Sequence, residues 1–182
     1  IWDGGRLSSV ACRPPMPPKQ ITPTSFVHLE TTKQMPFWLS KADGQCFFDQ
    51  LHLPAQLRKY MGRPRIKVAE LVGVEGITLA ELTSYLDTDG DLLLEHWVHP
   101  INMTWAMGFS WSSYIAQSVM VGSCKLAGLN DNQFLSDDCD IPERMHKVMA
   151  VATDDIMHLF CVGPELGDLR MQAIEQVWDQ IG

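Results

Sequence analysis

The sequence has few of the features that mark a membrane-spanning or secreted protein. Its 182 residues contain no uninterrupted run of 18 apolar residues, so no membrane span and no membrane partner are expected. Only five cysteines are present, an odd number, and no two of them form a C-x-x-C pair. We therefore expect a reduced, intracellular protein, with cytoplasm and nucleus left undecided.

Positive charge is also scarce. The chain has 14 lysines and arginines against 22 aspartates and glutamates, which gives a formal net charge of −8. Free-standing nucleic-acid binders are usually basic, so this balance counts mildly against that class. Five cations nevertheless gather in "RKYMGRPRIK" (58–67), which is either a local basic patch or an ordinary solvated loop.

What is present is enough for one domain with a real core, because 46% of the residues are hydrophobic. The ends, "IWDGG" and "WDQIG", suggest a piece cut from a larger protein. Five prolines within residues 11–24 predict an extended connector. A buried strand is expected over 37–43, a buried helix over 110–129 and an acidic loop over 130–142.

Two further helices have sequence signals at their starts. Thr78 and Glu81 form a capping-box pattern that opens a helix over 79–86. Pro164 fits the first turn of the last helix. The apolar face expected for that helix consists of Leu166, Leu169, Ala173, Val177 and Ile181.

The stretch "VATDDIMHLF" (151–160) places Asp154 and Asp155 between two apolar segments. This pattern predicts a hairpin of mostly buried strands with two carboxylates at its tip. Like charges repel there unless a divalent cation lies between them, and Mg²⁺ prefers oxygen ligands. Asp43 ends another apolar segment in the same way. A plain turn with solvated carboxylates is the alternative explanation.

Three motifs in this order resemble the palm of reverse transcriptases. The first is "KADGQCFFDQLHLP", with an aspartate followed by an aromatic residue. The second is "AMGFSWSSYIAQSVM", with a glycine turn, a helix start of small residues and a glutamine. The third is "VATDDIMHLF". The resemblance spans residues 1–182 and looks closest to retrotransposon or retroelement enzymes.

The resemblance implies an α+β fold, namely a polymerase right-hand palm with part of the fingers, in which an antiparallel sheet is backed by helices. Residues 1–182 would form one reverse-transcriptase-like fragment. Within it, 1–36 would be the end of the fingers and the proline-rich connector, and 37–182 the palm. Residues 70–98 would be an insertion.

Roles for individual residues also follow from the resemblance. The catalytic residues would be Asp43, Asp154 and Asp155, which would hold two Mg²⁺ or Mn²⁺ ions together with the Gly44 carbonyl. The partners would be an RNA or DNA template with its primer, and a deoxynucleoside triphosphate (dNTP). The residues implied in nucleotide binding are Cys46, Phe47, Phe48, Met107, Gly108 and Gln117, with Phe48 excluding a 2′-hydroxyl.

The leading hypothesis is therefore an RNA-directed DNA polymerase palm, a nucleotidyltransferase that joins a dNTP to a primer 3′-hydroxyl. The fragment alone is not expected to be active, because the thumb and part of the fingers are missing. The sequence also departs from the family at Ala152, where an aromatic residue is usual. Two alternatives stay open. One is a catalytically inactive descendant kept for binding or assembly, and the other is an unrelated metal-dependent phosphodiesterase.

Overall fold

The computed structural model describes residues 4–27, 29–139, 148–161 and 163–181. These residues fall into two compact units. We call residues 4–51 with 105–181 the sheet unit and residues 52–104 the ribbon unit, and each is described by itself. Parts of two predicted segments, 1–3 of the fingers end and 140–142 of the acidic loop, lie outside the described residues.

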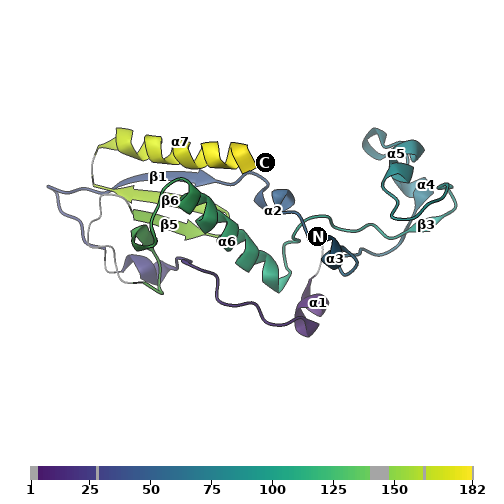
Figure 1. Ribbon diagram of the computed structural model, residues 1–182, viewed down its shortest axis with the longest axis horizontal. Helices are drawn as coiled ribbons and strands as arrows, with labels where there is room; N and C mark the ends of the chain where they lie inside the picture. The colour runs from purple at the N-terminus through teal and green to yellow at the C-terminus, as the bar shows by residue number, and fades with distance from the viewer. Residues whose placement is uncertain (1–3, 28, 140–147, 162, 182) are drawn as a thin grey trace. The chain divides into compact units, whose positions relative to one another are not determined.

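The sheet unit is built on a four-stranded sheet of order β1-β6-β5-β4 (Figure 1). Antiparallel pairing joins β1 to β6 and β6 to β5, whereas β4 runs parallel to β5. The fold is thus α+β, but the expectation of a purely antiparallel sheet is wrong at β4. The strands are β1 (Trp38–Asp43), β4 (Phe134–Leu135), β5 (Val148–Ala152) and β6 (Asp155–Phe160).

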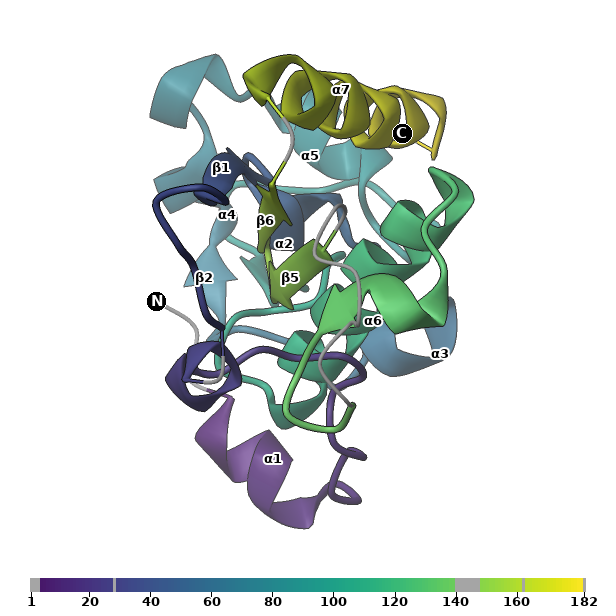
Figure 2. The same ribbon diagram turned by 90° about the vertical axis from the view of Figure 1, so that its left-hand side faces the viewer.

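Two long helices cover one face of this sheet. They are α6 (Ser110–Leu126) and α7 (Pro164–Ile181), which contact each other and are inclined to each other in Figures 1 and 2. The α6 helix packs on β5, and α7 packs on β1 and β6. The resulting core cluster includes Ala116 and Met120 from α6, Met149 and Val151 from β5, Ile156 from β6 and Ile174 from α7. The predicted buried helix is therefore confirmed as α6.

The buried face of α7 differs from the one expected. Met171 and Ile174 are buried, and Trp178 packs against the same cluster. Leu169 and Ile181, which were expected to face the core, have 63% and 57% of their surface exposed. The helix carries two overlapping apolar stripes at helical spacing, and the sheet selects the stripe with the larger side chains. The side chain of Leu166 lies outside the described residues.

The opposite face of the sheet is covered by the end of the proline-rich connector and the residues that follow it. Ile21 is buried against Leu135, Val148, Ala150 and Leu159, with Phe26 and Leu29 at the edge of this second cluster. The connector also adds a backbone bridge, because Gln20 pairs in parallel with Val151 of β5. Short helices flank it at α1 (Gly5–Val10) and η1 (Pro23–Phe26), and two others lie in the sheet unit at α2 (Phe47–Gln50) and η3 (Asp131–Gln133).

The ribbon unit consists of two limbs that run antiparallel, 52–69 and 94–104. Backbone hydrogen bonds join them from Leu53 N–H to Met103 O (2.8 Å), from Asn102 N–H to Met61 O (3.0 Å) and from Val68 N–H to His96 O (3.0 Å). Residues 70–93 form the end of the ribbon. The elements are α3 (Ala55–Arg58), β2 (Ile66–Lys67), α4 (Val68–Leu71), η2 (Val74–Gly76), α5 (Leu79–Ser84) and β3 (Trp97–Val98).

The capping box predicted for α5 is present. The Glu81 backbone N–H donates to the Thr78 hydroxyl (3.2 Å), and the Thr78 backbone N–H donates to the Glu81 carboxylate (2.8 Å). The Glu81 carboxylate also accepts a hydrogen bond from the Thr78 hydroxyl (2.8 Å), and the two bonds that it accepts, first the one from the Thr78 N–H, lower its pKa below the ordinary value. The helix thus begins where the sequence indicates, although it ends at Ser84, before residue 86. No helix among the described residues is long and apolar enough to cross a membrane.

Candidate active site

The turn of the β5–β6 hairpin consists of Thr153 and Asp154, between the paired residues Ala152 and Asp155. Thr153 adopts a φ of 61°, a left-handed conformation that is unusual for a β-branched residue. Such a conformation costs on the order of 1–3 kcal/mol and persists only where its surroundings enforce it. The enforcing contact is a hydrogen bond of 2.6 Å from the Thr153 N–H to the Gln117 Oε1 atom.

Gln117 is fully buried on α6, and it joins three segments that are distant in the sequence. Its Oε1 atom receives the Thr153 N–H, as above. Its Nε2 atom donates to the Val151 carbonyl (3.2 Å) and to the Pro18 carbonyl of the connector (3.1 Å). The side chain therefore fixes the hairpin turn relative to both the helix and the connector.

Asp43 meets this hairpin at the end of β1. It is the register partner of Asp155, and the next residue, Gly44, donates its N–H to the Asp154 carbonyl (3.0 Å). Directly paired residues on neighbouring antiparallel strands have Cβ atoms about 4.5–5.5 Å apart. The structure thus brings together Asp43, Gly44, Asp154 and Asp155. These residues meet at the edge of the sheet, because β1 is its edge strand. The residues of β1 are exposed or half-buried, so the expectation of a buried strand is wrong.

Lys41 belongs to the same group of charges, and sequence reasoning missed it. Its Nζ atom lies 2.8 Å from Asp155 Oδ1, and the side chains of the two residues are 52% and 37% exposed. The hydrogen bond and charge of Asp155 raise the pKa of Lys41, and Asp43 and Asp154 add to this effect. A signal was available, because Lys41 precedes Asp43 by two residues and strand residues two apart share a face.

The aspartate carboxylates are too few for a metal site made of protein ligands alone, but they are enough for a site that substrate phosphates complete. Among the described residues, no three His, Cys, Asp or Glu side chains form a group that could hold an ion. Mg²⁺, however, is commonly held by only one or two carboxylates together with substrate phosphates. The register pair Asp43 and Asp155, with Asp154 beside it in the turn, supplies carboxylates for that open kind of site, although the Lys41 ammonium already forms an ion pair with Asp155.

The turn after Asp43 is tightly built. A Cβ atom on Gly44 would lie 2.8 Å from the ring carbon Cδ2 of Phe47, so the close approach requires glycine. Cys46 has a φ of 50° and precedes α2, and the Phe47 N–H donates to the Gly44 carbonyl (3.1 Å). The amide of Phe47, which the resemblance implied for triphosphate binding, is therefore already engaged. Phe48 is half-buried against the core cluster.

The second predicted nucleotide-binding segment forms a turn before α6. The Phe109 N–H donates to the Ala106 carbonyl (3.2 Å), and Gly108 at the third position has a φ of 93°. This is the position at which a type II turn requires glycine. Met107, at the second position, is largely exposed. The α2 helix, which carries Phe47 and Phe48, contacts α6 directly.

In the ribbon unit, cations of the basic segment lie over aromatic rings. The Arg65 guanidinium and the Lys67 ammonium lie 4.9 and 5.6 Å from the centre of the Trp97 ring. The Lys59 ammonium lies 5.0 Å from the ring of Tyr60. Trp97 and Tyr60 are about half exposed. This segment therefore presents charge together with flat apolar surface to solvent.

Comparison with known proteins adds no relative. No protein-family model matches the chain, and no curated protein matches it. The functional interpretation consequently rests on the geometry of the aspartates and on the motifs that supply them.

Proposed function

We propose that the sheet unit is the palm of an RNA-directed DNA polymerase. The observation that carries this proposal is the convergence of Asp43 with Asp154 and Asp155, from segments separated by the whole ribbon unit and α6. Two helices back the same sheet, and Gln117 of α6 forms a hydrogen bond with Thr153 in the turn between β5 and β6. An ordinary surface turn needs none of these connections.

In this proposal Asp43 and Asp154 would hold Mg²⁺ or Mn²⁺, with Asp155 beside them. Bound metal would supply charge that stabilises the attacking and leaving oxygens of phosphoryl transfer. The protein itself would bind and orient the primer end and the dNTP, since positioning is its main contribution to such a reaction. Phe48 would restrict the sugar, and the turn at Met107 and Gly108 would border the nucleotide.

The template and primer are anionic and would bind to positively charged surface, which is scarce on the sheet unit. The ribbon unit has five cations, all within residues 58–67. Arg65 and Lys67 beside Trp97 combine phosphate attraction with a ring on which a base can stack. This combination supports a nucleic-acid partner despite the net charge of −8.

One observation favours the second candidate, a non-catalytic palm kept for binding or assembly. The Lys41 ammonium neutralises Asp155, which a catalytic site would leave available beside its metal ions. A lysine at this position can hold the hairpin to β1 without any ion. The unrelated phosphodiesterase remains a third interpretation, which would require the carboxylates but not the turns at Phe48 and Gly108.

Primer extension by the full-length protein that carries this chain separates the three. The polymerase proposal predicts Mg²⁺-dependent incorporation of labelled dNTP on an RNA template, lost by at least about 10³-fold in Asp43→Asn and Asp154→Asn. Asp49→Asn is the matched control, because Asp49 is an exposed carboxylate on α2 and should leave the rate unchanged. No incorporation by a folded wild type would support the non-catalytic palm. Metal-dependent cleavage of nucleic acid without incorporation would support the phosphodiesterase.

A further inference from the structure

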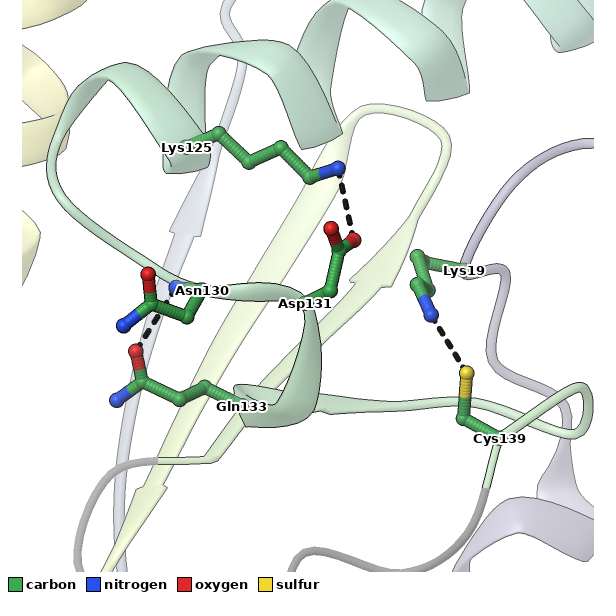
Figure 3. A network of polar contacts seen from close by, with 6 residues as sticks. All are labelled: Lys19, Lys125, Asn130, Asp131, Gln133 and Cys139. Carbon is green, nitrogen blue, oxygen red and sulfur yellow. Dashed lines mark hydrogen bonds and ion pairs between the residues drawn. The ribbon is translucent and has the colours of Figure 1, made fainter.

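Lys19 and Cys139 line an open hollow on the sheet unit. Figure 3 shows their side chains pointing toward each other. The Lys19 Nζ atom donates to the Cys139 Sγ atom at 2.5 Å. The hollow has a volume of about 650 Å³ and is lined by Lys19, Asp131, Asn132, Asp137, Asp138 and Cys139. Both side chains are half-buried, so small solutes can reach the sulfur.

The segment that carries Cys139 is held by a cage of hydroxyl groups. Asp137, two residues earlier, accepts hydrogen bonds from Ser25 Oγ (2.5 Å) and Thr22 Oγ1 (2.5 Å), and Thr24 Oγ1 contacts both of its carboxylate oxygens (3.2 and 3.3 Å). These bonds, first those from Ser25 and Thr22, lower the pKa of Asp137. The loop after β4 is thereby fixed to η1.

Lys19 is anchored on the other side. Its neighbour Pro18 accepts a hydrogen bond from Gln117, and its neighbour Gln20 pairs with Val151 of β5. The backbone of Lys19 itself has a φ of 52°, in the left-handed region. The lysine and the cysteine are therefore presented to each other by two independently anchored segments.

The surroundings of Cys139 differ from those of a structural cysteine in the same unit. Cys124 lies in the core, where burial raises its thiol pKa to about 12 and keeps it in the unreactive form. Cys139 instead accepts a hydrogen bond from an ammonium group. The sulfur of Cys139 is therefore open to small oxidants and lies within reach of a primary amine, whereas the sulfur of Cys124 is enclosed in the core.

We propose that Lys19 and Cys139 form an oxidation-dependent covalent link. A hydroperoxide oxidises the Cys139 thiolate to sulfenic acid, and the peroxide oxygen that is not transferred leaves as hydroxide or alkoxide. The neutral amine of Lys19 then attacks this sulfur. A sulfur–nitrogen bond forms, the sulfur–oxygen bond breaks, and one water leaves. Sulfenic acids undergo the same condensation with backbone nitrogen.

The link would tie the connector to the loop after β4. It would close a loop of 120 residues in sequence separation, which restricts the unfolded chain far more than a short loop does. It would also fix the position of Lys19. The residue before it, Pro18, bonds to Gln117, and the residue after it, Gln20, pairs with Val151 of β5, the strand that leads into the aspartate hairpin. Oxidation would therefore stiffen the support of the candidate active site, and thiol reductants would release it. The inference does not depend on the proposed polymerase activity.

The test uses intact and peptide mass spectrometry of the chain after treatment with hydrogen peroxide. The link predicts a loss of about 2 Da and a cross-linked peptide joining residues 19 and 139, both reversed by dithiothreitol. The yield of the cross-linked peptide should rise with pH, because the Lys19 amine must lose its proton before it can attack the sulfur. The hydrogen bond to Cys139, followed by the nearby charges of Asp138 and Asp131, raises the pKa of Lys19. The melting temperature should rise by several degrees on oxidation.

Two variants and a control separate this link from other oxidation products. Lys19→Arg keeps the positive charge and should give a sulfenic acid at Cys139, trapped by dimedone, without a cross-link. Cys139→Ser should give neither product, whereas Cys12→Ser should behave as the wild type. A disulfide involving Cys139, or a sulfenic acid that persists in the wild type beside an unmodified Lys19, would overturn the proposal. So would the absence of any peroxide product at Cys139.

Discussion

The two units of the chain are held together in different ways. In the sheet unit, the decisive polar contacts join segments that are far apart in sequence, such as Gln117 with Pro18 and Asp137 with Ser25. In the ribbon unit, the core is small, the capping box of α5 is local, and the paired limbs are joined by backbone hydrogen bonds. The contrast indicates that precise geometry resides in the sheet unit.

Charge is distributed differently as well. The ribbon unit separates its charges along the sequence, with all of its cations in residues 58–67 and all of its carboxylates in residues 70–95. The sheet unit instead places groups of carboxylates at the aspartate hairpin, beside Lys41, and in the loop around Asp137, beside Lys19 and Lys125. A reaction centre needs fixed opposing charges, whereas a binding surface tolerates a looser arrangement.

The largest effect is expected from removing the central contact of the sheet unit. Gln117→Leu conserves volume but leaves the Thr153 N–H and the Pro18 carbonyl without their partner, and unpaired groups of this kind cost about 1–3 kcal/mol each. We expect the free energy of unfolding to fall by about 2–6 kcal/mol in urea denaturation. Gln176→Leu, at an exposed position of α7, is the control and should change little.

A smaller effect, dependent on pH, is expected at Asp137. Its pKa is lowered in the folded state, so its contribution to stability is present above the unfolded pKa near 3.8 and is lost as the pH falls through the folded value. Asp137→Asn should therefore melt lower than the wild type at pH 7, and the difference should shrink below pH 4. A constant difference from pH 7 to pH 3 would show that the carboxylate charge is not what the hydroxyl cage recognises.

The smallest effect is expected in the ribbon unit. Thr78→Ala removes the hydroxyl that caps α5, a change that typically costs about 1 kcal/mol. Amide hydrogen exchange should accelerate over residues 79–85 and stay unchanged in β5 and β6. Faster exchange in the sheet unit as well would mean that the two units unfold together and would break the comparison.

The sequence predicted the elements whose signal is local. The hairpin at 151–160 was visible because two apolar segments flank two aspartates, and α6 because it is long, apolar and free of proline. The start of α5 followed from Thr78 and Glu81, whose hydrogen bonds form within one turn. In each case the residues that decide the structure are neighbours in the chain.

The sequence failed where distant partners decide. The two residues of β4 are buried on opposite faces, so they show no alternation and were assigned to an acidic loop. The buried stripe of α7 depends on which side chains the sheet accepts. Lys41 escaped notice because its importance arises from Asp155 on another strand. The meeting of Asp43 with Asp154 and Asp155 was expected mainly through the resemblance to polymerases, and the register that pairs Asp43 with Asp155 was not predicted, since no local pattern specifies strand partners.

The most direct test of the proposal that the aspartates bind metal is thermal melting of the chain with EDTA and with millimolar Mn²⁺. Binding to the folded state raises stability by mass action, so the wild type should melt higher with Mn²⁺. Asp154→Asn should lose that gain. Without metal it should remain as stable as the wild type, because its backbone bond to Gly44 and the Lys41–Asp155 ion pair are retained. A wild type that gains nothing from Mn²⁺, together with an Asp154→Asn variant that melts lower in EDTA, would contradict the account and make the aspartates a structural turn.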